Sequence, residues 1–429
     1  MKKSNNLKTL CRLAVLTFIG APIGSALATD GYFSHGYGMK AKGMGGASVA
    51  TAQDAFAGAN NPASAVWAGN RLEGGVDIFM PKRGMSRTAS GLGPVNVDSG
   101  ANTFLVPELG YNKIINDSLA VGVTVFGNGG MNTEYAGGQL NCGAGPNTAN
   151  VLCGSGKLGV DLMQLIVAPT VAYKFSEQHS IGVSPLLVYQ KFKVDGLQAF
   201  TLMSSDSSKL SNNGYSTSTG VGVRLGYFGK LSEAVNIGAS YSPKTKMGKF
   251  GDYAGLFAGG GGFDIPENYA LGVSVQATSA LLVAMDYQRI NYSKVPSIGN
   301  PSTNQAFLGT ANGPGFGWRD ISVWKLGAQW QATPQLALRT GVNISQNPVQ
   351  SENVTFNILA PGVVTSHFTL GATYALSPST ELTVAYMQAP KRSVTGSSLF
   401  NTLSGPGAGG NETIYMSQRS LGVQFGQKF

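Results

Sequence analysis

Apolar and polar residues alternate with a period of two over much of the chain beyond about residue 70. Val221, Val223 and Leu225, for example, alternate with Gly222 and Arg224. The same period recurs in residues 235–241, 269–275 and 336–344. Successive side chains of a β-strand point to opposite faces, so these runs predict strands with one apolar face and one polar or small face. Strands that cross an outer membrane have this pattern, with the apolar face toward lipid.

Short polar turns and long loops separate the predicted strands in alternation. The predicted strands are 71–80, 103–115, 119–127, 162–175, 180–194, 219–230, 234–245, 267–276, 280–292, 319–331, 336–346, 364–376, 381–390 and 416–429. The long Gly-, Ser- and Asn-rich loops are 81–101, 128–160, 195–217, 246–264, 294–317, 347–362 and 391–414. Short turns at one end, long loops at the other and an even strand number, here about 14, are typical of outer-membrane barrels, with the short turns in the periplasm.

A soluble β-sandwich is the main alternative, because its strands also alternate. It would bury the apolar face in a core and carry similar polar turns at both ends. The final predicted strand places Leu421, Val423 and Phe425 on one face and reaches the aromatic Phe429, a pattern typical of barrels that the outer-membrane assembly machinery recognises. The prediction is therefore an all-β, transmembrane antiparallel barrel of about 14 strands, with the barrel assembly machinery as a partner.

The first 28 residues have the three parts of a secretory signal peptide. Basic residues precede the apolar stretch Leu13–Ile19, and the small residues Ala26 and Ala28 follow it. A membrane anchor is the alternative, but the apolar stretch is shorter than the roughly 18 residues that span a bilayer. We expect cleavage after Ala28 and a mature protein in the bacterial outer membrane. Cys11 would leave with the signal peptide.

The amino-acid composition further restricts the class of protein. Glycine contributes 60 of 429 residues, and only 12% of residues are charged, about half the usual share. The hydrophobic content of 42% argues against disorder. Loss of the signal peptide lowers the formal net charge from +9 to +5, and no dense Lys/Arg block remains, so nucleic acid is not an expected partner.

No arrangement of residues predicts catalysis, a metal or a cofactor. His35, His179 and His367 are scattered, and no G-x-S-x-G motif occurs. Residues 405–410 match G-x-G-x-x-G but lie in a predicted loop without strand-to-helix context. We therefore expect no enzyme, no metal site and no cofactor. Cys142 and Cys153 lie in one long loop of an exported protein, where a disulfide is favoured.

Residues 29–69, before the first predicted strand, lack the alternation. Ser48–Ala57 is predicted as a short helix that ends before Pro62. A barrel of about 14 strands has a lumen too wide for its own side chains to fill. We therefore expect residues 29–69 to form a plug, or hatch, inside a barrel made by residues 70–429.

Several motifs carry a resemblance to a known family. They are the Gly43–Gly46 run, the Asp54–Ala55 pair and Asn61-Pro62-Ala63, with further similar phrases at 169–174, 325–330 and 338–342. Over nearly the whole mature chain, these resemble the outer-membrane transporters of long-chain fatty acids and aromatic hydrocarbons, the FadL/TodX/OmpP1 family. The resemblance implies a monomeric 14-stranded barrel with an N-terminal hatch, surrounded by outer-membrane lipid and lipopolysaccharide. It also implies that Asn61, Pro62 and Ala63 lie beside a kinked third strand, where a lateral opening passes a hydrophobic ligand into the bilayer.

Glycines in the third predicted strand are candidates for that opening, since glycine permits a kink or bulge. They are Gly122 and Gly127; the alternative is that they are ordinary barrel glycines. Apolar residues in the predicted extracellular loops are candidates for ligand capture, or else they pack together to order the loops. They are Leu197, Phe200, Leu202, Met203, Leu256 and Phe257.

Basic residues in the hatch or facing the lumen are candidates to pair with a carboxylate head group. They are Lys40, Lys42, Arg224 and Arg339, and participation in networks of the wall is the alternative. Uptake of long-chain fatty acids or hydrocarbons is thus the predicted function. A diffusion porin for polar solutes is the main rival, and a structural or adhesin barrel is a third possibility that would need no hatch.

Overall fold

The computed structural model describes residues 30–142 and 148–429. The predicted signal peptide and its cleavage site lie outside the described residues.

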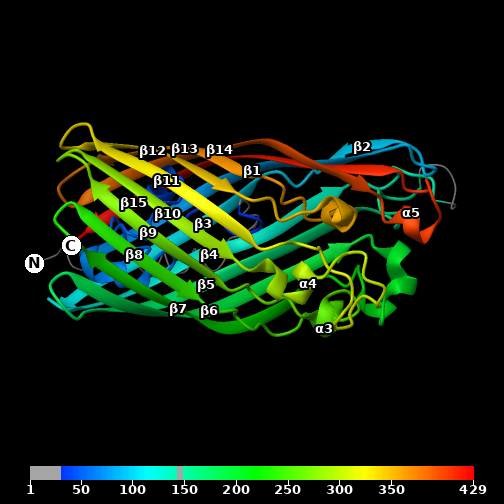
Figure 1. The fold of residues 1–429 in the computed structure, drawn as a ribbon, viewed down its shortest axis with the longest axis horizontal. Helices are drawn as coiled ribbons and strands as arrows, with labels where there is room; N and C mark the ends of the chain where they lie inside the picture. Colours follow the sequence, from blue (N-terminus) through cyan, green and yellow to red (C-terminus); the bar gives the residue numbers. More distant parts are fainter. Residues whose placement is uncertain (1–29, 143–147) are drawn as a thin grey trace, which may run out of the picture.

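The described chain folds as a single antiparallel sheet that closes on itself (Figure 1). Its strands are β1 (Arg71–Thr88), β2 (Val95–Asp98), β3 (Phe104–Asn116), β4 (Leu119–Tyr135), β5 (Leu158–Lys174), β6 (His179–Asp195), β7 (Ser216–Lys230), β8 (Val235–Ser242), β9 (Asn268–Gln276), β10 (Leu281–Ile290), β11 (Ile321–Gln331), β12 (Leu336–Ser345), β13 (Ser366–Ala375), β14 (Thr380–Ser397) and β15 (Asn411–Lys428). Apart from β2, each strand pairs with its neighbours in sequence, so that β1 pairs with β3, and β15 pairs with β1 to close the ring. Because β2 pairs with β1 alone, the closed barrel has 14 strands.

The six predicted tight turns all join consecutive strands at one end of the barrel (left in Figure 1). At the other end several strands run further than predicted, because β4 continues to Tyr135 and β14 to Ser397. Lipid no longer selects apolar residues where a strand leaves the bilayer, so the alternation fades before the strand ends. For the same reason β2, which lies within the predicted loop 81–101, was not predicted.

The two faces of the wall meet different solvents. Leu225, Leu271 and Phe368 point outward and are 47%, 56% and 54% exposed, whereas the inward Asn343 and Gln424 are buried. A soluble sandwich would show the reverse, so that alternative is wrong. No helix in the described part of the chain is long and apolar enough to cross a membrane.

Residues 30–70 lie inside the barrel, where nearly all of their side chains are buried (Figure 1). The segment contains helix α2 (Met39–Gly43) and the 3-10 helix η1 (Pro62–Trp67). The predicted helix over Ser48–Ala57 is wrong, because the backbone there bonds to the wall instead. Ser48 and Val49 donate N–H groups to the Asp286 carboxylate at 2.7 and 2.9 Å. Pro62, expected to end a helix, begins η1, since proline at a first helical position forfeits no hydrogen bond.

Short helices occur in the loops at the far end. They are η2 (Gln198–Met203), η3 (Ser207–Lys209), η4 (Gly251–Tyr253), α3 (Ala258–Gly261), η5 (Tyr292–Lys294), α4 (Pro296–Gly299), η6 (Ser351–Asn353), η7 (Phe356–Ile358) and α5 (Phe400–Leu403).

Candidate functional site: a wall window and two apolar cavities

The wall is interrupted between β3 and β4. Their ladder begins at the tight turn and stops where Leu109 pairs with Val125. Beyond that point, residues 104–108 of β3 pair only with β1, and residues 126–135 of β4 pair with β5. The two edges meet again further up, where the Gly100 N–H donates to the Glu134 carbonyl at 2.8 Å. We call this bounded gap the lateral window.

A β-bulge in β4 borders the window. Gly127 pairs with Leu165 and Gly129 pairs with Gln164. Asn128 is therefore an extra residue on β4 that has no partner residue on β5. A bulge bends its strand and ends regular pairing on one side, which accounts for the separation of β4 from β3.

The N-terminal segment holds this bulge from inside. Phe33 forms a bridge with Gly129, and the Tyr37 hydroxyl donates to the Asn128 carbonyl at 3.2 Å. A Cβ atom at Gly129 would lie 2.2 Å from the Tyr32 carbonyl oxygen. Glycine is therefore required there by close approach of the two backbones.

The two glycines predicted at the opening have different positions. Gly127 adjoins the bulge. Gly122 pairs with Asn112 on one side and with Thr170 on the other. The assignment of Gly122 to the opening is wrong, because it is an ordinary glycine of a fully paired stretch. Sequence reasoning missed Gly129, since the predicted strand ended at residue 127.

The Asn61-Pro62-Ala63 motif lies against a different part of the wall. The Asn61 side chain donates to the carbonyls of Val49 and Tyr227, at 2.8 Å each, and accepts from the Ala63 N–H. The backbone of Pro62 and Ala63 approaches Gly182 of β6 and Gly226 of β7 so closely that a Cβ atom at either glycine would clash. The expectation that the motif lies beside the kinked third strand is therefore wrong. It fastens the N-terminal segment to β6 and β7.

An apolar cavity of about 40 Å³ lies among the extracellular loops, and we call it the loop cavity. Four of the six predicted capture residues line it: Leu197, Phe200, Leu256 and Phe257. The other two do not, because Leu202 is 91% exposed and Met203 packs against the core beside it. Sequence reasoning missed Leu308, Phe316, Phe356 and Leu359. They too are apolar residues in predicted polar loops, so the same criterion would have found them.

A smaller cavity of about 30 Å³, the window cavity, lies between the N-terminal segment and the bulged strand. Gly31 and Tyr32 line one side, and residues 130–132 of β4 line the other. Leu359 lines both cavities. The loop cavity and the space next to the lateral window therefore share Leu359 as a lining residue.

The four predicted head-group partners are engaged within the protein. Lys40 forms an ion pair with Glu381 at 2.5 Å, and Lys42 lies 3.0 Å from Asp77 and 2.8 Å from Glu108. The partners of the two arginines are neutral: Arg224 donates to the carbonyls of Gly58 and Ala59 and to Ser242, and Arg339 donates to Thr373. Two clusters of ion pairs, one around Lys40 and one around Lys42, therefore join the N-terminal segment to the wall. The charges of these lysines pair with carboxylates of the protein itself.

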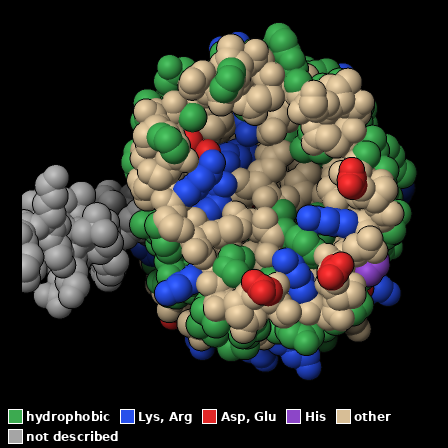
Figure 2. All heavy atoms as spheres, turned by 90° about the vertical axis from the view of Figure 1, so that its left-hand side faces the viewer, with side chains coloured by type: hydrophobic (Ala, Val, Ile, Leu, Met, Phe, Trp, Pro, Cys, Tyr) green, Lys and Arg blue, Asp and Glu red, His purple; other side chains and the backbone are tan. Residues whose placement is uncertain are grey.

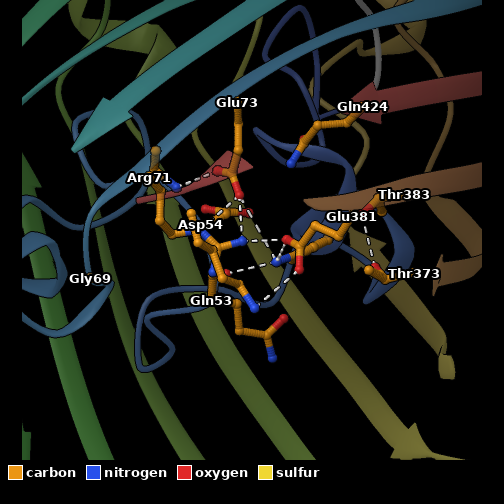
Figure 3. Close-up of polar contacts among 12 residues, drawn as sticks. Gln53, Asp54, Gly69, Arg71, Glu73, Thr373, Glu381, Thr383 and Gln424 are labelled. Atoms are coloured by element: carbon orange, nitrogen blue, oxygen red, sulfur yellow. Dashed lines mark hydrogen bonds and ion pairs between the residues drawn. The ribbon is translucent and has the colours of Figure 1, made fainter. Parts of the chain in front are cut away.

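Figure 3 shows the larger of these clusters, in which Arg71 and Glu73 of β1 and Glu381 of β14 surround Asp54. Burial, together with the neighbouring charge of Glu73, raises the pKa of Asp54 to about 7. Burial acts to lower the pKa of Lys42, but the carboxylates of Asp77 and Glu108 outweigh it and raise that pKa above its ordinary value. Seen from the end with the tight turns, the barrel is hollowed, and Lys and Arg side chains lie in the hollow (Figure 2).

The structure joins Cys142 and Cys153 in a disulfide within the extracellular loop. Among residues 30–142 and 148–429, no group of three or more His, Cys, Asp or Glu side chains is arranged to hold a metal ion.

A closed 14-stranded barrel with a lipid-facing apolar surface, a filled lumen and a gap in its wall defines an outer-membrane transport protein. The chain belongs to the family of outer membrane protein transport proteins (OMPP1/FadL/TodX), which matches residues 26–406. This is a family of transport proteins and not of enzymes.

Solved structures have the same fold. The toluene transporter TodX of Pseudomonas putida is 19% identical, covering 94% of this chain and 100% of that chain with a TM-score of 0.66. A FadL homologue of Pseudomonas aeruginosa is 15% identical, covering 93% and 100%, with a TM-score of 0.68. The toluene transporter TbuX of Ralstonia pickettii is 19% identical, covering 92% and 99%, with a TM-score of 0.62. No curated protein is significantly similar in sequence.

Proposed function

We propose that this protein takes up hydrophobic small molecules, long-chain fatty acids or hydrocarbons, and releases them sideways into the outer membrane. The observation that carries the proposal is the sequence of spaces from the loop cavity, past Leu359, to the window cavity and the lateral window. Two structural neighbours are toluene transporters, which agrees with an apolar cargo.

A sideways route suits such a cargo physically. An apolar molecule gains about 0.8 kcal/mol for each CH₂ group that leaves water, so a wet channel along the barrel axis offers it nothing. The lipopolysaccharide leaflet obstructs direct partitioning, and an intact barrel wall has no edge through which a ligand could leave. The interrupted ladder between β3 and β4 supplies that edge.

Residues 30–70 act as the hatch in this proposal. Their ion pairs at Lys40 and Lys42 and the hydrogen bonds of Asn61 fasten them to β1, β3, β7 and β14. A filled lumen argues against the rival diffusion porin, which needs an open axial path. The barrel would act as a monomer surrounded by lipid and lipopolysaccharide.

The loop cavity is smaller than its ligands. Its volume is about 40 Å³, whereas a cavity that binds benzene has a volume of roughly 150 Å³. Ligand capture therefore requires the loops around Phe200, Phe257 and Phe356 to move apart.

Deleting Asn128 tests the route, because it restores equal residue numbers on β4 and β5 and so removes the bulge. We expect uptake of a radiolabelled hydrophobe such as dodecanol by cells to fall at least about 10-fold while binding to the purified protein persists. The matched control is Asn128→Ala, which keeps the bulge and removes only the side-chain bonds to Gln164 and Tyr37.

Heat-modifiable mobility on gels reports that each variant has folded. Unchanged uptake by the folded deletion variant would contradict lateral release and favour a path along the lumen. Loss of binding together with uptake would place the bulge in the binding site instead of the exit.

A further inference from the structure

Arg83 of β1 is a buried cation without an anionic partner among the described residues. It points into the barrel, is 3% exposed and lines the window cavity. One guanidinium nitrogen, Nη1, donates to the Asn132 carbonyl, and Nε and Nη2 have no hydrogen-bond partner. The guanidinium also makes a cation–π contact, 5.5 Å from the centre of the Phe104 ring. A buried charge in this condition is unfavourable unless something pairs with it.

The unpaired edge of Arg83 is the one that binds carboxylates elsewhere in the same barrel. Arg71 uses Nε and Nη2 together to bind Glu73, and Arg87 uses the same two nitrogens to bind Glu412. These two N–H groups form a fork that matches the two oxygens of a carboxylate. In Arg83 the fork is the part without a partner.

Two other buried arginines also lack a carboxylate, but they differ from Arg83. Arg224 directs Nε to Ser242 and Nη1 to two backbone carbonyls. Arg339 donates through Nη1 to Thr373, and it does not line either the loop cavity or the window cavity. Arg83 alone among these three combines an unpaired fork with a place on the proposed route.

We propose that Arg83 binds the carboxylate of an amphipathic substrate as it passes from the loop cavity to the lateral window, so that the cargo includes hydrophobic acids. The window cavity, at about 30 Å³, has room for about two water molecules, since one needs roughly 10–15 Å³ on this measure, so it suits a head group and not the body of a ligand. The apolar chain trails toward the loop cavity, which shares Leu359 with the window cavity and widens when the loops move apart.

This inference rests on the proposed function and deepens it by naming the substrate class. Tritiated dodecanoate and dodecanol share one chain length and differ in the charged group, so they separate recognition of the head from burial of the chain. Binding is measured at pH 7.5 with the protein in lipid nanodiscs, with empty nanodiscs subtracted. The wild-type protein should bind dodecanoate more tightly than dodecanol.

Substituting Arg83→Met should weaken dodecanoate binding about 10- to 100-fold, the range for a charge-assisted hydrogen-bonded pair, and change dodecanol binding less than about 2-fold. Arg83→Lys should give an intermediate loss for dodecanoate, because lysine keeps the charge without the fork. The control is Arg319→Met at a loop arginine that is 67% exposed, which should alter neither ligand.

Equal weakening of both ligands by Arg83→Met would overturn the inference, since Arg83 would then only support the fold of the cavity. Tighter Arg83-dependent binding of dodecyl phosphate than of dodecanoate would overturn the assignment to carboxylates. If dodecanol and dodecanoate bind equally and Arg83→Met changes neither, the inference fails while uptake of hydrophobes stands. Failure of the wild-type protein to bind either ligand would instead overturn the proposed function.

Discussion

At the scale of single residues, charge fastens the N-terminal segment to the wall, and Asp54 is a buried carboxyl beside a second carboxylate. Lys40 and Arg71 face Glu73 and Glu381 in the cluster around Asp54, and Lys428 lies 3.5 Å from Glu381. The pKa of Asp54 is raised to about 7, first by burial and then by the charge of Glu73. Asp54 is therefore mostly protonated below about pH 7 and mostly charged above it.

The titration of Asp54 makes the docking of the segment dependent on pH. The folded pKa of Asp54, about 7, lies above the value of about 3.9 in an unfolded chain. The folded state therefore binds more protons between these limits, and stability falls as the pH rises from about 4 to about 7. In the wild-type protein, hydrogen exchange of residues 30–70, corrected for its intrinsic pH dependence, should show weaker protection at pH 8 than at pH 5.

Asp54→Asn should remove that difference, because asparagine keeps an oxygen for the Phe56 N–H and has no charge. The gain in protection at pH 8 should be on the order of 1–3 kcal/mol. Asp117→Asn, at an exposed carboxylate in the β3–β4 turn, is the control and should leave the pH dependence unchanged. Equal protection of the wild-type segment at both pH values would contradict the argument.

At the scale of elements, two of the interruptions in strand pairing have different causes. Between β3 and β4 the cause is the bulge at Asn128. Between β5 and β6 the ladder runs from Gly159 to Val167 and resumes at Val171, and Pro169 lies opposite Pro185 in the interval. Both prolines lack an N–H group, so two donors that would cross this interval are missing without any change of register.

Restoring those donors should strengthen the wall. The double substitution Pro169→Val and Pro185→Val adds an N–H group on each of two facing, outward residues, and valine suits the lipid-facing surface. We expect the free energy of unfolding in liposomes, measured by urea titration, to rise by about 1–2 kcal/mol in total. Each single substitution is the matched control and should give about half of that gain. A loss of stability would show that the rigidity of proline in the unfolded chain outweighs the two bonds.

The strands and turns of the barrel were predictable where the lipid requires apolar residues on one face of a strand. Turn positions such as Asn116–Ser118 were predictable because strand alternation stops there, and the structure confirms them. The extension of β4 beyond Gly127 was not, because the stretch with Gly127, Gly129 and Gly130 has no period. The lateral window is a stretch where β3 and β4 do not pair. Whether two strands pair depends on their register, and a loss of pairing does not change the pattern of apolar residues.

The candidate site was predictable only in its apolar part. Leu197, Phe200, Leu256 and Phe257 were identifiable because large apolar residues are unusual in polar loops. The head-group residues were not, since a sequence shows which cations face the lumen but not which of them have partners. Lys40 and Lys42 have carboxylates within 3.0 Å, whereas Arg83 has none among the described residues.

At the scale of the whole molecule, the N-terminal segment fills space inside the barrel and supplies partners for inward carboxylates of the wall. A wall of 14 strands encloses more space than its inward side chains fill, and the inward carboxylates Asp77, Glu108 and Asp286 find their partners on residues 38–49. The segment bonds within itself, for example where the Asn61 side chain donates to the Val49 carbonyl, and it is fastened to the wall on several sides. In the proposed function this segment closes the axial path, and the barrel could lose it without breaking any pairing between the strands β1 to β15.

Deletion of residues 30–69 should therefore convert the protein from a nearly closed barrel into a wide, water-filled channel. The carboxylates that lose their partners would line water and be solvated, so the ring of strands should survive, as heat-modifiable mobility on gels can show. In planar lipid bilayers the wild-type protein should give little steady conductance, and the deletion variant large and weakly selective steps. Removal of residues 90–93 at the tip of the β1–β2 hairpin, outside the barrel lumen, is the matched control and should leave conductance low. Large conductance of the wild-type protein itself would mean that the segment does not seal the lumen, and uptake through an axial route would then become the simpler account.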